Sequence, residues 1–280
     1  MSAEGGITVV VPVFNAADEL GQCLDSLHST LEPGRPVLVI DDASTDPAAQ
    51  EVLRGWKERQ IPKWRIVANE SNLGFVGTAN RGMRMAPGDV VLLNSDTITT
   101  PGWLEALERC LASDPAIATA TPWTNNGEIA SLPGFCEVNP VPSDPTAVAH
   151  AIGRFGTPQY PEIPTAVGFC MAVSHRAIDR VGLVDEERFG KGYGEENDFS
   201  MRARQAGMRN VLCDDAYVVH LGGRSFGPLG LKPDDSSMQR LLTCHPGYLQ
   251  IVQAFINEDP LSGRRKELVA QMEREGLRLG

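Results

Sequence analysis

Val90-Val91-Leu92-Leu93-Asn94-Ser95-Asp96-Thr97 is the stretch that best indicates the fold. Its apolar run, between Pro87-Gly88 and a polar cluster, predicts a short buried strand, although a run of this length also fits a helix segment. In an open α/β sheet the ligand lies beyond the carboxyl ends of the strands, so Asp96 is expected to project into a site. A carboxylate there can hold a divalent metal, and the metal can hold a diphosphate. An isolated aspartate at a strand end can equally close a turn or cap a helix, so the rest of the chain has to decide.

Apolar runs alternate with helical patterns on both sides of this stretch. The expected strands are Ile7–Val11, Val37–Ile40 and Arg65–Val67, and the expected helices are Asp18–His28, one from Pro47, Phe75–Met85 and one from Thr100-Pro101. Pro47 suits a first helical turn, where the backbone amide has no partner within the helix. Repeated strand-helix units predict an α/β fold with a mostly parallel central sheet flanked by helices.

The composition is that of a globular protein with an acidic surface. The chain has 280 residues, of which 42% are hydrophobic, enough for one large domain or one domain with appendages. With 36 acidic and 25 basic residues its net charge is −11, which argues against a nucleic-acid binder, since such proteins neutralise phosphates with Lys and Arg. The six scattered cysteines lack CxxC spacing and predict reduced core thiols. We see no signal peptide and no apolar run of ~18 residues, so we expect a cytoplasmic protein without a membrane span.

The end of the first expected strand excludes two classes of nucleotide-using enzyme. A dinucleotide-binding dehydrogenase needs GxGxxG there, because glycines let the pyrophosphate approach a helix N-terminus. A sugar nucleotidyltransferase also needs a glycine-rich phosphate loop at this point. The chain instead has Pro12-Val13-Phe14-Asn15, which is better suited to supporting a nucleoside than to binding phosphates.

The second half of the chain is less regular. Pro122–Pro164 is rich in Pro, Gly and Asn with little periodicity, and we interpret it as a loop over the site. A strand at Ala166–Val173 and a helix from Arg176 to near Gly182 follow. Glycines in Phe189–Gly194 then lead into a helix through Ala206.

Glu195, Glu196 and Asp198 crowd the first turn of that helix. Acidic residues there can simply stabilise the helix dipole, by ~0.3–1 kcal/mol each. The preceding glycines favour a functional interpretation, because they let the backbone pass close to a ligand. Further on, an expected strand at Tyr217–Val219 leads to His220, and a single histidine at a strand end is more often structural than a metal ligand.

The chain ends in helices that are interrupted at His245-Pro246-Gly247 and at Asp259-Pro260. The charged part from Arg264 to Arg278 resembles a solvated helix. We therefore divide the chain into a catalytic domain, residues 1–235, and a C-terminal helical extension, residues 236–280, which could also be a linker to a further domain.

Taken together, the chain resembles the family 2 inverting glycosyltransferases of the GT-A fold, from Ile7 to Ser225. Five segments in the expected order carry the resemblance: Pro12–Asn15, Val39–Asp46, Asn72–Phe75 with Asn80 and Gly82, Leu93–Thr97, and Gly194–Asp198 followed by His220. The resemblance implies a Rossmann-like nucleotide-binding half and an acceptor half. The segments Asn72–Phe75 and Leu93–Thr97 are most similar to a rhamnosyltransferase-like branch.

The resemblance also implies roles for single residues. Asp42 would bind the nucleotide base, and Asp96 with His220 would bind Mn²⁺ or Mg²⁺. Glu196 would be the catalytic base, with Glu195 and Asp198 as alternatives. The remaining donor-site positions are Pro12, Phe14, Asp41, Ser44, Asn72, Gly74, Asn80, Asn94 and Ser95.

Three positions depart from the family pattern. Asn94 replaces the first acid of the DxD motif, so metal binding depends more on Asp96 and His220. Glu196 is one methylene longer than the usual aspartate, which leaves the choice of base open. Ala79 stands where relatives carry an arginine before Asn80, so no contact to the base or diphosphate is assigned there.

The sequence thus predicts a metal-dependent inverting glycosyltransferase that uses a nucleoside-diphosphate sugar, dTDP-rhamnose or a UDP-sugar. The acceptor would be a hydroxyl of a glycan or a lipid-linked saccharide in bacterial surface polysaccharide synthesis, with peripheral membrane contact and no nucleic acid as partner. The alternative is a non-catalytic nucleotide-sugar or glycan-binding module within a larger polysaccharide-assembly protein.

Overall fold

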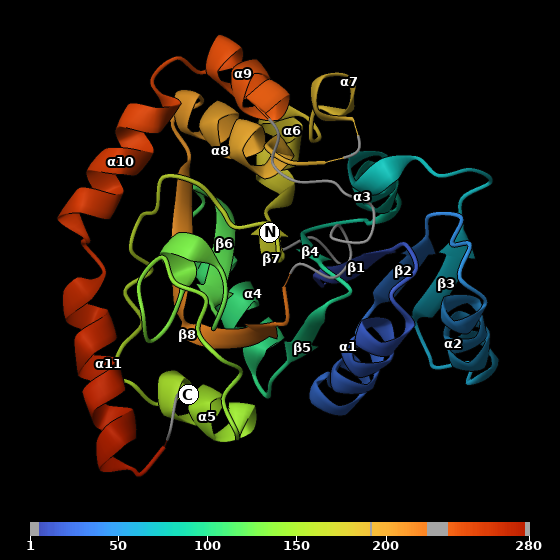
Figure 1. Ribbon diagram of the computed structural model, residues 1–280, viewed down its shortest axis with the longest axis horizontal. Helices are drawn as coiled ribbons and strands as arrows, with labels where there is room; N and C mark the ends of the chain where they lie inside the picture. The colour runs from blue at the N-terminus through green and yellow to red at the C-terminus, as the bar shows by residue number, and fades with distance from the viewer. Residues whose placement is uncertain (1–5, 191, 223–234, 278–280) are drawn as a thin grey trace.

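A central sheet organises the computed structural model, which describes residues 6–190, 192–222 and 235–277 (Figure 1). Within these residues eight strands lie in the order β3-β2-β1-β4-β7-β6-β8-β5. Their bounds are β1 Thr8–Val13, β2 Val37–Asp41, β3 Trp64–Ala68, β4 Val90–Leu93, β5 Thr97–Thr99, β6 Ile117–Trp123, β7 Cys170–Val173 and β8 Arg209–His220. Pairs β1/β2, β2/β3, β1/β4 and β6/β8 are parallel, whereas β4/β7, β6/β7 and β5/β8 are antiparallel. The predicted mostly parallel α/β sheet is confirmed.

Helices cover both faces of the sheet. On one face Val9 and Val11 pack with α1 (Ala17–Thr30), α2 (Pro47–Glu58) and α4 (Trp103–Ser113). On the other face Val10 packs with α3 (Gly74–Met85), α6 (His175–Val181) and α8 (Glu195–Gln205). Since successive strand residues point to opposite faces and both faces are buried, the centre of β1 needs apolar side chains at consecutive positions, as Val9, Val10 and Val11 provide.

Several helix boundaries follow from local chemistry that the sequence shows. Asp46 caps α2, because its side chain accepts a hydrogen bond from the Ala48 amide (3.0 Å), and Pro47 lies in the first turn as predicted. The helix that begins at His175 ends at Gly182, whose φ of 81° favours glycine.

Pro122–Pro164 contains more regular structure than predicted. Strand β6 continues through Pro122 to Trp123, a 3₁₀ turn η1 spans Glu128–Ala130, and helix α5 spans Pro145–Gly153. Asp144 caps α5 by accepting a hydrogen bond from the Ala147 amide (2.9 Å). The interpretation of the whole stretch as a loop was therefore wrong, because Asp144-Pro145 is a helix-start signal that the many glycines and prolines obscured.

The strand expected at Ala166–Val173 is shorter in the structure, where β7 begins at Cys170. The backbone amides before it bond to side chains instead of a neighbouring strand. Ala166 donates to Ser200 Oγ (3.0 Å) and Val167 donates to Thr121 Oγ1 (3.2 Å). The apolar pattern alone could not reveal these side-chain partners.

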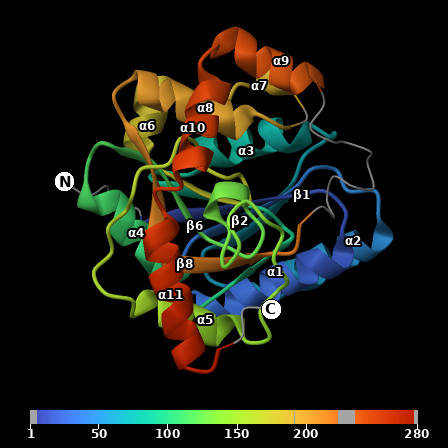
Figure 2. The ribbon, with the colours of Figure 1, turned by 60° about the vertical axis from the view of Figure 1, so that its left-hand side comes forward.

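The C-terminal helices pack against the rest of the chain. They are α9 (Asp235–Cys244), α10 (Tyr248–Glu258) and α11 (Ser262–Arg274), interrupted at the two predicted places. Figures 1 and 2 show α10 and α11 running along one side of the molecule, with α11 reaching α5. Leu268 and Met272 of α11 are fully buried, so this helix is not solvated on all sides as its charges suggested. Arg278 and residues 223–234, which include Arg224 and Ser225, lie outside the described residues.

In the described part of the chain no helix combines the length and the apolar character needed to cross a bilayer.

Candidate functional site

The loops after β1 and β2 are tied together at the carboxyl edge of the sheet. Asn15 donates its backbone N–H to Ser44 Oγ (2.9 Å), and its side-chain oxygen accepts hydrogen bonds from the amides of Thr45 and Asp46 (both 2.9 Å). Asp41 accepts a hydrogen bond from the Ser44 amide (2.9 Å). Parallel pairing of β1 with β2 therefore brings two segments with predicted donor residues together, Pro12–Asn15 and Val39–Asp46.

Pro12 and Phe14 are placed differently with respect to this edge. Pro12 is buried within β1, whereas Phe14 lies half-buried just beyond the strand. Of the two, Phe14 is the better placed to contact a ligand at the edge.

The Asp42 carboxylate makes its hydrogen bonds mainly within the protein. It is only 3% exposed and accepts hydrogen bonds from Asn69 Nδ2 (2.7 Å) and from the amides of Leu73 (2.7 Å) and Gly74 (2.8 Å). These bonds hold the start of α3, where Gly74 has a φ of 77°. Asn72 lies alongside and donates to the Asp42 carbonyl (3.3 Å). These three hydrogen bonds show that the Asp42 carboxylate organises the loop around it. The predicted contact with the nucleotide base would be a fourth hydrogen bond to the same carboxylate.

Asn80 lies away from these groups. It is 1% exposed, and its side-chain amide donates to the carbonyl of Val184 (3.0 Å), next to the short helix α7 (Glu186–Phe189). This contact ties α3 to the α6–α7 connection, and it gives Asn80 a structural role beside the predicted donor role.

A second cluster lies where β4 ends, between β5 and β8. Pairing of Thr97 with His220 brings the His220 ring near Asp96, and Nε2 lies 3.6 Å from Asp96 Oδ1. Asn94 and Ser95 are the two residues before Asp96, Asn94 half-buried and Ser95 buried. The expectation that Asp96 and His220 meet is met by this geometry.

His220 is oriented like a metal-ligating imidazole. Its Nδ1 lies 2.6 Å from the carbonyl of Asn126, and its ring stacks on Phe169. A proton on Nδ1 leaves the lone pair of Nε2 directed at Asp96. Burial alone would lower the pKa of His220, but the Asp96 carboxylate and the Asn126 carbonyl outweigh burial and raise the pKa above its ordinary value.

The donor atoms of this pair fit a divalent ion. Asp96 is 3% exposed, yet its Oδ1 has no hydrogen-bond partner in the described structure. A carboxylate oxygen and an imidazole nitrogen are compatible with Mn²⁺. No third His, Cys, Asp or Glu joins them among the described residues, so further ligands would come from the substrate or from water.

The three acidic residues of α8 differ in environment. Asp198 is 1% exposed and pairs through one oxygen with Arg202 Nε (2.7 Å) and through the other with His245 Nε2 (2.8 Å). It is therefore the least available of the three to a substrate. Burial, followed by the charge of Glu196, raises the pKa of Glu195 well above its ordinary value, and its Oε2 has no partner in the described structure.

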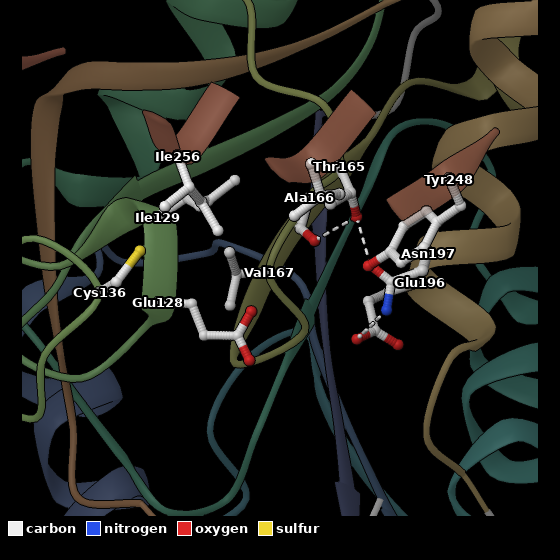
Figure 3. A pocket seen from close by; sticks show the side chains of 11 residues that line it. Glu128, Ile129, Cys136, Thr165, Ala166, Val167, Glu196, Asn197, Tyr248 and Ile256 are labelled. Carbon is white, nitrogen blue, oxygen red and sulfur yellow. Dashed lines mark hydrogen bonds between the residues drawn. The ribbon is translucent and has the colours of Figure 1, made fainter. Parts of the chain in front are cut away.

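The side chain of Glu196 lines a cavity of about 240 Å³ (Figure 3). Burial raises its pKa, and the charge of Glu128 adds to the effect, whereas amides at the start of α8 oppose it. Asn197, beside it, accepts a hydrogen bond from Thr165 Oγ1 (2.6 Å) and donates to Glu196 (3.2 Å). A carboxylate with a raised pKa that faces a cavity is suited to general base catalysis.

The pKa of Tyr193 responds to carboxylates of both groups of residues. Burial raises its pKa first, and the charges of Glu195, Glu196 and Asp96 add to it. All three carboxylates therefore lie within electrostatic reach of one phenol.

Of the described residues that line the cavity, only Glu196 was a sequence candidate; Glu128 and Tyr248 are among those that were missed. Glu128 was placed in a loop without a motif, and Tyr248 was placed in the extension. Only the tertiary structure brings them to Glu196.

Comparisons with known proteins bear on the family and the fold. The family model described as Glycosyl transferase family 2 matches residues 8–182. The uncharacterized protein Rv1525 of Mycobacterium tuberculosis is 24% identical over 225 residues, which are 78% of this chain and 75% of the relative.

Two solved structures are similar to the chain throughout. GalNAc-T7 with UDP, GalNAc and Mn²⁺ has a TM-score of 0.65 at 14% identity, over 98% of this chain and 55% of that one. S. aureus TarS in complex with UDP-GlcNAc has a TM-score of 0.60 at 18% identity, over 90% of this chain and 72% of that one. The chain thus spans about half of the GalNAc-T7 chain. At these identities the likeness establishes the fold alone, which is the GT-A fold.

Proposed function

The chain belongs to glycosyl transferase family 2, and on that premise we propose that it is a metal-dependent inverting glycosyltransferase. It transfers a sugar from a nucleoside-diphosphate donor to a hydroxyl of a glycan or glycolipid. The observation that carries the proposal is the Glu196 carboxylate, which lines a cavity and has a raised pKa. No contact among the described residues favours the alternative of a non-catalytic module.

The proposed reaction is a single displacement. Glu196 accepts the proton of the acceptor hydroxyl, whose oxygen bonds to the anomeric carbon while the bond from that carbon to the diphosphate breaks. The electron pair of the broken bond leaves on the nucleoside diphosphate. Attack from the side opposite the leaving group inverts the anomeric centre.

Asp96 and His220 are the residues that would hold the metal. Bound there, a divalent ion would supply positive charge to the diphosphate of the donor. The Asn126 carbonyl and the Phe169 ring hold the His220 ring in place. Asp96 Oδ1 is buried, lies 3.6 Å from His220 Nε2 and has no hydrogen-bond partner among the described residues, which supports this assignment.

We propose first the chemical class of the donor and then one particular sugar nucleotide. Likeness to structures that hold UDP, UDP-GlcNAc or GDP-Man supports a nucleoside-diphosphate sugar as donor without selecting its base. The sequence resemblance to a rhamnosyltransferase-like branch favours dTDP-rhamnose. Synthesis of a bacterial surface polysaccharide at the cytoplasmic side of the membrane is proposed on the same resemblance.

Calorimetry with UDP, dTDP and GDP, each with Mn²⁺ and then with EDTA, tests the donor and the metal together. We expect one nucleotide to bind with Mn²⁺ and to lose its binding with EDTA. Glu196→Gln should keep this binding while turnover of the matching nucleotide sugar falls by ~10²–10⁴. Glu258→Gln, at an exposed position of α10, is the matched control and should keep full turnover. Binding that is unchanged by EDTA would contradict the metal assignment, and full turnover by Glu196→Gln would contradict the base assignment.

A further inference from the structure

We propose that Glu128 and the inner face of α10 form the acceptor site, and that this site selects a non-acidic saccharide. The inference rests on the proposed function, since it assigns the acceptor to the cavity at Glu196. The wall opposite Glu196 carries Glu128 from η1, and the α10 face contributes Tyr248, Val252 and Ile256. The acceptor site would thus be completed by the C-terminal helices.

The backbone holds Glu128 in an unusual conformation. Its φ is 49°, in the left-handed region that side-chain-bearing residues rarely adopt. Its carbonyl accepts hydrogen bonds from the amides of Ser131 and Cys136 (both 3.1 Å), which fix this turn. Strained residues that the surrounding structure holds in place cluster at ligand sites. Figure 3 shows the Glu128 and Glu196 carboxylates entering the cavity from opposite sides.

Charge in the cavity is of one sign. Glu128 and Glu196 are acidic, and neither lysine nor arginine occurs among the described lining residues. The nearby Arg265 is paired with Asp259, with Nη1 3.1 Å from Oδ1. Two carboxylates in a partly enclosed site repel an acceptor that carries a carboxylate or phosphate, and they accept hydrogen bonds from hydroxyl or ammonium groups.

The other wall of the cavity is apolar. Val167, Val252 and Ile256 line it together with the ring of Tyr248, which is 7% exposed. Such a surface suits the C–H face of a sugar ring, while the carboxylates take its hydroxyls. At about 240 Å³ the cavity lies below the ~300–1,000 Å³ of sites for larger ligands, which suits a single ring.

Cys136 allows the charge of the cavity to be measured without a substrate. It lines the cavity and is exposed, whereas Cys23, Cys110, Cys170 and Cys213 are buried and Cys244 is partly buried. Its modification rate is measured with a cationic trimethylammonium-ethyl and an anionic sulfonatoethyl methanethiosulfonate, with Cys136→Ser giving the background. The ratio of the two rates cancels the reactivity of the Cys136 thiol, and dividing it by the same ratio for 2-mercaptoethanol cancels the difference in intrinsic reactivity between the reagents.

We expect Cys136 to react about tenfold faster with the cationic reagent than with the anionic one, after this correction. Glu128→Gln should lower this preference several-fold, and Glu258→Gln should leave it unchanged. Equal rates for the two reagents, or an unchanged preference in Glu128→Gln, would overturn the proposal. This measurement does not depend on glycosyltransferase activity.

Turnover then tests acceptor choice. The acceptors are the p-nitrophenyl glycosides of glucose, glucosamine and glucuronic acid, each with the donor whose nucleotide binds. The glucuronide should have a KM at least tenfold above that of the glucoside, and Glu128→Gln should narrow this difference while the donor KM stays constant. A glucuronide used as well as the glucoside, or a change confined to the donor KM, would overturn the assignment. Absence of turnover with every pair would count against the proposed function, whereas the Cys136 ratio would still decide the charge selectivity.

Discussion

Glu195 is a buried carboxylate whose ionisation the fold disfavours. It is 6% exposed, its Oε2 has no partner in the described structure, and burial together with Glu196 raises its pKa well above the ordinary value. A carboxyl group with a raised pKa in the folded state binds its proton more tightly there than in the unfolded chain. Its contribution to stability is therefore full below the unfolded pKa of ~4.3 and is lost as the pH rises through the folded pKa.

We predict that Glu195→Gln is more stable than the natural protein at pH 8, and that the difference disappears at about pH 4. The glutamine keeps the shape of the side chain and removes the charge that burial penalises. Urea unfolding of both proteins at the two pH values measures this difference in stability. Glu187→Gln, at an exposed position of α7, is the control and should show no such pH dependence. A Glu195→Gln variant that is less stable than the natural protein at pH 8 would mean that the ionised carboxylate has a stabilising partner.

Helix α3 approaches the sheet closely at Gly82. A Cβ on this residue would lie 2.2 Å from Val10 Cγ1, because α3 packs directly on β1. We predict that Gly82→Ala lowers the free energy of unfolding by ~1–3 kcal/mol, although alanine favours a helix by ~1 kcal/mol. Gly55→Ala, in α2 with no atom near the new Cβ, should be neutral or stabilising. Adding Val10→Ala to Gly82→Ala should restore part of the lost free energy of unfolding. If it restores none, the loss does not come from the contact between residue 82 and Val10.

His245 joins the C-terminal helices to helix α8. It is 4% exposed, its Nε2 lies 2.8 Å from Asp198 Oδ1, and Gln205 Nε2 lies 3.2 Å from its Nδ1. Because an amide nitrogen only donates, the imidazole proton lies on Nε2 and points at the carboxylate. The contact is a hydrogen bond to a buried charged group, which contributes more than a bond between neutral groups.

We therefore predict that His245→Ala lowers the free energy of unfolding by ~2–3 kcal/mol. His150→Ala, at an exposed position of α5, should change it by less than ~0.5 kcal/mol. Chemical unfolding of His245→Ala, Asp198→Asn and the double variant measures the coupling between the two residues. Additive losses would show that the two side chains do not interact, contrary to the geometry.

The elements differ in how far their sequences reveal them. Strands β1, β2 and β4 are buried on both faces, so their apolar runs were sufficient to predict them. Strand β6 was missed because Pro122 lies in it, and proline usually excludes a central strand. The position of Glu128 could not be predicted, since its left-handed backbone and its distance from Glu196 depend on contacts between segments remote in sequence. The predicted pair of Asp96 and His220 was found because a family pattern marks both residues.

At the scale of the whole molecule, the C-terminal helices bear on how far the catalytic unit extends. We propose that they belong to it, although the sequence also allowed a linker. Leu268 is fully buried in a cluster with Ile152 of α5, and Arg264 Nε lies 2.9 Å from Asp214, which is fully buried in β8. Helix α10 also lines the cavity at Glu196. These contacts couple the extension to the sheet.

We predict that Leu268→Ala destabilises the whole molecule by ~2–5 kcal/mol, because it leaves a cavity between α11 and α5. The four tryptophans, at positions 56, 64, 103 and 123, all precede the extension, so their fluorescence reports only on the body of the protein. If the extension folds with that body, Leu268→Ala must shift the fluorescence transition in urea to lower concentration. Leu249→Ala, at a position of α10 that is 49% exposed, should leave the transition in place. An unshifted transition in Leu268→Ala, together with a separate loss of helical circular dichroism, would mean that the extension unfolds independently, and the acceptor site would then lack a fixed α10 wall.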